Sequence, residues 1–385
     1  MTALIPTFRR PGALARCLRA LAAQDLREGY EVVVGVDGGA EADSGEVEIA
    51  REAMPAARVV MLGKLGPAGV RNALLREARG EIVLWLNDDV APRSDCLRMH
   101  VRAHEEIAGG KDDGRGLAPA ACREREDSGT RCRHGVPTYP GQGLAPVACA
   151  EGRAAAGCDM VVGASPWRVH EDDTLFDRVV RETSMIFFYD RMDAMVRDDA
   201  ARARSHDWGF RHAWTLNLSV RRHAMEGCAF DASLPCACFE DLEWAHRMAQ
   251  TRGSRVLYRP EAIVEHDHRI DLDSYLRRER MLGREAFRLA TLKPACARAI
   301  FGRDVASADE VGYATQFVER ERGNAERIEE HLRETGSRPA GWIDDAGVAR
   351  EMVRALYEMH LPLKRRHWRM GLVEAADAGV RTRAA

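Results

Sequence analysis

Two adjacent carboxylates, Asp88 and Asp89, follow the apolar residues Leu84–Leu86 and a single Asn87. Charged groups at the end of a buried strand need a partner, and paired carboxylates bind hard divalent cations through their oxygen atoms. A cation held in this way can neutralise a diphosphate. Aspartate is also common at the start of helices, where it caps the first turn. These residues alone leave a metal site and a helix cap as two open interpretations.

Two histidines, His266 and His268, follow a predicted strand and the loop-forming Pro260. Histidine is a frequent metal ligand and changes its charge near neutral pH, and a structural role is the alternative. His100 and His104 share one face of a predicted helix but lack the glutamate placement of a metalloprotease helix. The first pair is therefore a candidate ligand pair, and we interpret the second pair as structural.

The elements that must position these residues alternate between apolar runs and helices in the first part of the chain. The apolar runs, which we predict to be strands, are Thr2–Pro6, Tyr30–Val36, Val59–Leu62 and Ile82–Leu86. Apolar residues at helical spacing separate them, which gives the order βαβαβαβ. Buried strands that alternate with helices predict a parallel sheet covered on both faces, with a ligand cleft at the carboxyl ends of the strands.

The second part of the chain is less regular. Residues Gly109–Gly157 are rich in Gly, Pro, Ala and mixed charge and are too long for an ordinary connection, so we predict a flexible insertion or lid. Predicted strands and helices return after it at Met160–Val162, Trp214–Val220, Glu240–Gln250 and Arg255–Tyr258. From Ser274 onward the pattern is mostly helical.

The composition favours a globular protein. Of the 385 residues, 45% are hydrophobic and 30% are charged, and the formal net charge of −3 gives no reason to expect a nucleic-acid partner. No apolar run approaches the roughly 20 residues of a membrane helix and no secretory signal is evident, so we expect a cytoplasmic location. The basic segment Lys364–Arg369 would suit an anionic membrane surface, which predicts peripheral association at the inner face of the membrane; a solvated helix face is the alternative.

Five blocks, taken in order, resemble glycosyltransferase family 2. They are Ile5–Pro11, Val32–Gly39, Gly66–Ala73, Gly80–Val90, and Asn217–Val220 together with Phe239–Asp241. Each block alone is a modest match, but the five blocks in this order are specific to the family. The resemblance implies an α/β protein with the Rossmann-like GT-A fold, in which helices flank a mostly parallel central sheet. It also implies an inverting enzyme that moves a sugar from a nucleotide-diphosphate donor to an acceptor hydroxyl.

The resemblance also suggests how the chain is divided. We expect a GT-A domain over residues 1–275, with a nucleotide-binding half at 1–108, the flexible insertion or lid at 109–157 and an acceptor-binding half at 158–275. Residues 276–385 would form a mainly helical C-terminal extension. The acceptor stays open between a glycan, a lipid-linked molecule and a small molecule.

Several residues match positions that bind the donor in this family. Pro6 and Thr7 would lie beside the nucleotide base or ribose, Asp37 would contact the base, and Asp88 would lie on the ribose side. Arg71 would contact the nucleotide or a phosphate through charge-assisted hydrogen bonds, and a surface helix arginine is the alternative.

The resemblance assigns the metal and the base as well. Asp89 matches the metal ligand, with Mg²⁺ or Mn²⁺ as the cation, and His266 or His268 would complete the metal shell or touch the diphosphate. Asp241 matches the usual general base, because an inverting transfer needs a carboxylate opposite the leaving diphosphate to deprotonate the attacking hydroxyl. The alternative for Asp241 is a helix N-terminal acid stabilised by the helix dipole.

Two departures from the family pattern keep other functions open. Val36 stands in place of an acid, and Asn87 stands where an aspartate is frequent. A catalytically silent nucleotide-sugar binder or assembly protein is therefore one alternative, and a nucleotidyltransferase on a related sheet is another. Aromatic residues that could stack on sugar rings in an acceptor groove, or pack in the core, are Trp167, Trp208 and Trp214.

Overall fold

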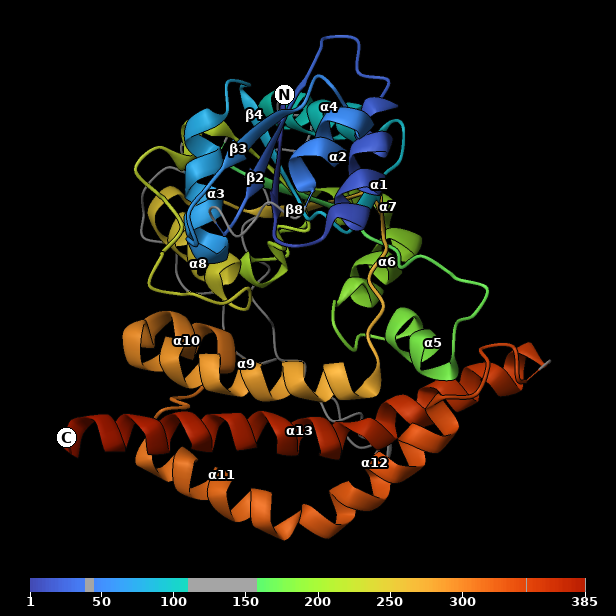
Figure 1. Cartoon of the computed structure of the whole chain (residues 1–385), viewed down its shortest axis with the longest axis vertical. Coiled ribbons are helices and arrows are strands. Elements are labelled where there is room, and N and C mark those ends of the chain that lie inside the picture. The colour runs from blue at the N-terminus through green and yellow to red at the C-terminus, as the bar shows by residue number, and fades with distance from the viewer. Residues whose placement is uncertain (39–44, 110–157, 344, 385) are drawn as a thin grey trace, which may run out of the picture.

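The computed structural model describes residues 1–38, 45–109, 158–343 and 345–384 (Figure 1). Residues 110–157, nearly all of the predicted insertion or lid, lie outside the described residues. The described strands are β1 (Thr2–Thr7), β2 (Glu31–Val36), β3 (Arg58–Met61), β4 (Ile82–Leu86), β5 (Val90–Pro92), β6 (Met160–Ala164), β7 (Asn217–Arg221) and β8 (Val256–His266).

One mixed sheet contains these eight strands in the order β3-β2-β1-β4-β7-β6-β8-β5. Strands β3, β2, β1 and β4 pair in parallel, as the alternation of apolar runs and helices predicts. Strand β7 runs antiparallel to both β4 and β6, and β5 runs antiparallel to β8. The predicted α/β architecture is therefore confirmed, with a parallel first half and a mixed second half.

Strand β8 differs from the short strand predicted at Arg255–Tyr258. It continues through Pro260 as far as His266. It pairs first with β6, up to Ile263, and then with β5, and the register of its pairing with β6 shifts between Arg259 and Ile263. An irregularity of this kind tolerates a proline, because the missing N–H is not needed for a ladder hydrogen bond. His266 consequently lies on a strand, opposite Val90, rather than in a loop.

Helices flank the sheet in the first part of the chain, except the helix at Leu175–Glu182, which packs on the C-terminal helices. They are α1 (Pro11–Ala22), α2 (Glu46–Ala53), α3 (Gly66–Glu77), α4 (Cys96–Ala108), α5 (Leu175–Glu182), α6 (Tyr189–Asp198), α7 (Ala200–Ser205) and α8 (Glu240–Arg252). Short 3₁₀ turns lie at Phe210–His212 and Arg222–Met225. Helix α3 packs on β1 and β2, and it approaches β2 so closely that a Cβ at Gly35 would lie 2.9 Å from Leu74 Cγ.

The predicted helical C-terminal region is also confirmed. It consists of α9 (Leu272–Leu292), α10 (Pro294–Phe301), α11 (Ala308–Arg320), α12 (Arg322–Gly336) and α13 (Ala346–Ala384). Helices α9 and α13 run alongside each other below the sheet in Figure 1. Gly283 and Gly371 stand at their contact, where a side chain would collide with the backbone of the other helix.

The basic segment of α13 takes part in this helix packing. Lys364 is buried, Trp368 packs against Phe301, and the Arg369 guanidinium lies over the Phe317 ring. Most of the residues that suggested a membrane surface are thus engaged with other helices. Among the described residues, none of the helices combines the length and the apolar character that crossing a membrane requires.

Candidate functional site

The carboxyl ends of β1 and β4 bring the first group of predicted site residues together. Residues 2–4 of β1 pair with 83–85 of β4, so Thr7 and Asp88 leave the sheet side by side. The Thr7 hydroxyl donates a hydrogen bond to Asp88 Oδ2 at 2.7 Å, and both side chains are buried. Burial and the charge of Asp89 raise the pKa of Asp88 to about 6, although Thr7 and Arg10 oppose the shift.

Arg10 joins this group although the sequence interpretation did not include it. Its Nη1 lies 2.7 Å from Asp89 Oδ2 and 3.3 Å from Asp88 Oδ1. The loop that carries it is held by Glu46, whose Oε1 accepts a hydrogen bond from the Arg10 backbone N–H at 3.2 Å. The only sequence signal for Arg10 is a cation placed just after the strand that ends at Thr7.

His266 and His268 face Asp89 from the end of β8. His266 Nε2 lies 3.6 Å from Asp89 Oδ1, and His268 Nδ1 lies 3.3 Å from Asp89 Oδ2. The two imidazole rings are nearly parallel, with centroids 5.8 Å apart. Burial alone would raise the pKa of Asp89, but the two histidines hold it well below its usual range. The structure thus brings together all three residues that the sequence suggested as metal ligands.

The chemistry of these three side chains fits a divalent cation. Asp89 Oδ1 is buried and has no hydrogen-bond partner among the described residues, since His266 Nε2, at 3.6 Å, is too far away for a hydrogen bond. Within the described part of the chain, no three or more His, Cys, Asp and Glu side chains form a group that could hold a metal ion by itself. Asp89, His266 and His268 therefore offer a partial donor set, which oxygen atoms of a diphosphate or water would have to complete.

Arg71 lies in a second group, together with Glu240 and Asp241. Its Nη1 donates to Glu240 Oε1 at 2.7 Å and its Nη2 donates to Thr215 Oγ1 at 2.8 Å. The side chains of Arg71, Glu240 and Thr215 are buried, and that of Asp241 is half-buried. These bonds connect α3 to the first turn of α8. The contacts therefore support a positioning role for Arg71, and its predicted contact with the donor stays untested.

Asp241 stands at the first turn of α8. Its Oδ1 accepts a hydrogen bond from the Leu242 N–H at 2.8 Å, and its side chain is half-buried. Burial and the neighbouring Glu240 raise the pKa of Asp241 to about 7, and Arg71 opposes the shift. A carboxylate that titrates near neutral pH is suited to accept a proton during a reaction.

Asp37 and Pro6 lie at the neighbouring strand ends. Asp37 accepts hydrogen bonds from the backbone N–H groups of Leu65, at 2.7 Å, and Gly66, at 3.1 Å. It thereby holds the loop that precedes α3, where Gly66 has a left-handed φ of 70°. Pro6 is half-buried in β1, opposite Gly35 of β2.

The remaining candidates have packing contacts. His100 is hydrogen-bonded to Ser219 and Asn217, and burial lowers its pKa to about 4. Trp214 is buried among aromatic rings, whereas Trp167 is half-buried with its ring centroid 4.3 Å from that of His266. Of the three tryptophans named above, Trp167 is thus the one that borders the Asp89 group.

Comparison with known proteins agrees with this geometry. Residues 2–111 match the model of Glycosyl transferase family 2. Over these residues the chain is similar to family 2 glycosyltransferases. The match agrees with the predicted family for this part of the chain, and the sheet described above agrees with the GT-A fold that the family implies. The matched residues include β1 to β4 and both Asp88 and Asp89.

Among curated proteins, the chain resembles the uncharacterized glycosyltransferase YfnE of Bacillus subtilis over part of its length. The two are 28% identical over 102 residues, which is 26% of this chain and 26% of YfnE. The matching part therefore spans about a quarter of that relative's length.

Two solved structures show more distant likeness. S. aureus TarS 1-349 is 14% identical with a TM-score of 0.40, over 98% of this chain and 91% of that one. The mannosyltransferase PcManGT from Pyrobaculum calidifontis, solved with GDP-Man and Mn²⁺, is 16% identical with a TM-score of 0.47, over 97% of this chain and 86% of that one.

Proposed function

We propose that this chain transfers a sugar, with inversion, from a nucleotide-diphosphate donor to an acceptor hydroxyl, with the help of a divalent metal. One observation carries the proposal. Within and beside the residues that match family 2, the ends of β1, β4 and β8 bring Thr7, Asp88, Asp89, His266 and His268 into one group. A ligand cleft is expected at such strand ends in an α/β sheet.

The donor would lie along this edge of the sheet. Asp37 and Pro6, at the ends of β1 and β2, would contact the base, and Asp88, which accepts a hydrogen bond from Thr7, would contact the ribose. Asp89, His266 and His268 would hold the metal, which when bound would neutralise the diphosphate as it leaves. Mg²⁺ and Mn²⁺ both remain candidates, with diphosphate and water oxygens completing the ligands of either ion.

Asp241 would act as the general base. The proton of the acceptor hydroxyl would pass to an Asp241 carboxylate oxygen while the hydroxyl oxygen attacks the anomeric carbon. Glu240 is held by Arg71 and by the Cys238 N–H, so its carboxylate is already committed to hydrogen bonds within the protein. This leaves Asp241 as the acid of the pair that can exchange a proton with a substrate.

The division of the chain remains part of the proposal. Residues 1–108 would bind the donor, 158–275 would bind the acceptor, and 276–385 would support both halves from the helical region. A glycan, a lipid-linked molecule and a small molecule remain acceptor classes. A cytoplasmic location and association with the inner face of the membrane remain predictions.

A thermal-shift panel tests this function. UDP, GDP, dTDP and CDP, each with and without Mn²⁺, are compared on the parent protein, on Asp89→Ala and on Asp95→Ala. A ligand that binds only the folded state raises the melting temperature. We expect one nucleotide to give a Mn²⁺-dependent shift that Asp89→Ala loses and Asp95→Ala keeps, since Asp95 is partly exposed and makes only a 3.9 Å ion pair with Arg98.

Two results would contradict the proposal. The absence of any shift with all four nucleotides would refute the donor site. A nucleotide shift without turnover of the corresponding nucleotide sugar would instead favour the catalytically silent binder.

A further inference from the structure

Asp267 lies between the two histidines that face Asp89. Successive side chains of an extended segment point to opposite sides, so the Asp267 carboxylate is directed away from its two neighbours. Its backbone N–H donates a hydrogen bond to the Asp89 carbonyl at 2.8 Å. The main chain of Asp267 therefore already joins the end of β8 to the segment that carries Asp89.

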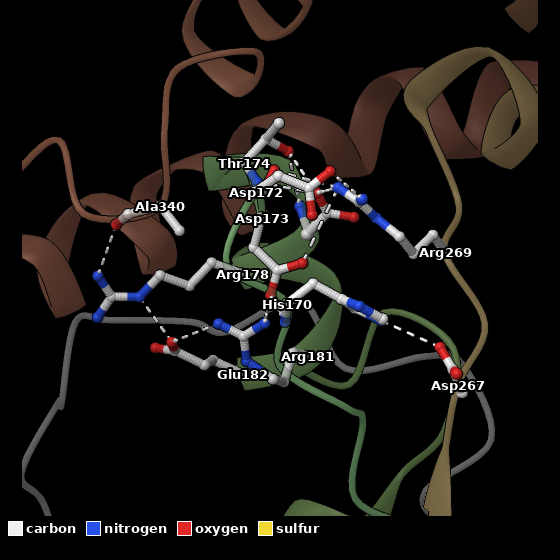
Figure 2. A network of polar contacts seen from close by, with 11 residues as sticks. His170, Asp172, Asp173, Thr174, Arg178, Arg181, Glu182, Asp267, Arg269 and Ala340 are labelled. Carbon is white, nitrogen blue, oxygen red and sulfur yellow. Dashed lines mark hydrogen bonds and ion pairs between the residues drawn. The ribbon is translucent and has the colours of Figure 1, made fainter.

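The Asp267 carboxylate is surrounded by two guanidinium groups and an imidazole. Arg16 Nε of α1 lies 2.8 Å from Oδ2, Arg168 Nη1 lies 3.2 Å from Oδ2, and His170 Nε2 lies 3.0 Å from Oδ1. Figure 2 shows His170 directed at Asp267. Only 11% of the Asp267 side chain is exposed. Because both oxygens are occupied by protein groups, this carboxylate is not a candidate ligand itself.

The segment that supplies two of these groups runs beside His266. The His266 N–H donates to the Pro166 carbonyl at 2.8 Å, and the Arg168 N–H donates to the His266 carbonyl at 2.9 Å. The segment from Pro166 to His170 is therefore joined to the end of β8 twice. Backbone hydrogen bonds join it to His266, and the side chains of Arg168 and His170 join it to Asp267.

The same segment is tied to the C-terminal region. The Ala340 N–H donates to the Asp173 carbonyl at 2.8 Å, and the Leu175 N–H donates to the Arg338 carbonyl at 2.8 Å. Arg269, next to His268, donates to Asp172 Oδ2 at 2.7 Å. Figure 2 shows the contact between Arg269 and Asp172 within a network of polar side chains around the start of α5, in which Arg178 donates to the Ala340 carbonyl.

We propose that Asp267 is a positioning residue that keeps His266 and His268 directed at Asp89. The inference rests on the proposed metal-assisted function. Groups that orient metal ligands from behind contribute to metal affinity, and their removal typically costs about 10-fold to 100-fold in that affinity. The ion pair with Arg16 and the charge-assisted hydrogen bond from Arg168 supply the rigidity at this position.

Mn²⁺ binding to the full-length protein tests this role without any measurement of activity. Free Mn²⁺ is followed by its electron paramagnetic resonance signal while protein is titrated, and melting temperature is recorded for each variant. We expect Asp267→Ala to weaken the Mn²⁺ affinity about 10-fold to 100-fold. Asp267→Asn, which keeps the shape and one acceptor oxygen but loses the charge, should fall between Asp267→Ala and the parent.

Asp172→Ala is the matched control, since Asp172 belongs to the same network but its side chain is 77% exposed and pairs with Arg269 rather than with the groups around Asp267. It should leave Mn²⁺ affinity within about twofold of the parent. If Asp267→Ala fails to fold, Asp267→Asn carries the test. A lower melting temperature with unchanged Mn²⁺ affinity would overturn the inference. Absence of Mn²⁺ binding by the parent, with nucleotide shifts intact, would refute the metal assignment itself.

Discussion

Arg71→Met tests whether Arg71 holds α8 in place or contacts the donor. Arg71 and Glu240 side chains are only 6% and 3% exposed, so water screens their 2.7 Å ion pair very little. Removing one partner leaves the other charge buried without compensation, which costs about 3–5 kcal/mol of unfolding free energy. The Thr215 hydroxyl also loses its 2.8 Å hydrogen-bond partner.

The assay is urea denaturation followed by tryptophan fluorescence, with Arg76→Met as the control. Arg76 lies on the same helix and is exposed, so its replacement should change the unfolding free energy by no more than about 0.5 kcal/mol. The double variant Arg71→Met with Glu240→Gln should recover part of the loss, because no unpaired charge then remains buried.

The nucleotide shift separates the two interpretations. Near-parent stability of Arg71→Met, combined with a lost nucleotide shift, would refute the positioning role and favour the donor contact that the sequence predicts. Arg71→Lys should be intermediate, because lysine keeps the charge but lacks the fork that reaches both partners.

Two further predictions concern the base and the packing of α3. Because the pKa of Asp241 is raised to about 7, its unprotonated form prevails above that pH, and transfer rates should fall about tenfold per pH unit below it; a flat rate profile between about pH 5 and 8 would contradict the base assignment. Gly35→Ala should cost about 1–3 kcal/mol of unfolding free energy, because its Cβ would lie 2.9 Å from Leu74 Cγ. Gly312→Ala, with nothing within 4 Å of the added Cβ, should be neutral or stabilising, and urea denaturation would compare the two.

The first half of the fold could be predicted because its signals are local. Each of β1, β2 and β4 is a nearly continuous apolar run, which is the pattern of a strand buried on both faces. The direction of β7 and the length of β8 were not predictable in this way. Strand direction depends on which strands become neighbours, and Pro260 indicates a strand end unless a shift in register accommodates it.

The same contrast between local and distant signals applies to the residues of the candidate site. Residues that follow strands, such as Asp88 and Asp89, could be named as candidates from their position. Arg10 and Asp267 could not, because their partners are distant in sequence: Arg10 is 78 residues from Asp88, and Arg168 is 99 residues from Asp267. The same distance explains why Arg71 was assigned to the donor, since its partner Glu240 lies 169 residues away.

The two acidic pairs follow one electrostatic rule. Adjacent carboxylates in a poorly solvated position cannot both behave as ordinary acids, so their surroundings separate their roles. In the first pair, burial raises the pKa of Asp88, whereas the histidines hold that of Asp89 low and keep it charged. In the second pair, Arg71 engages Glu240 while burial raises the pKa of Asp241 to about 7. Asp89 is thereby suited to remain an anion beside a cation, and Asp241 is suited to gain and lose a proton. A metal ligand and a general base require these two different properties.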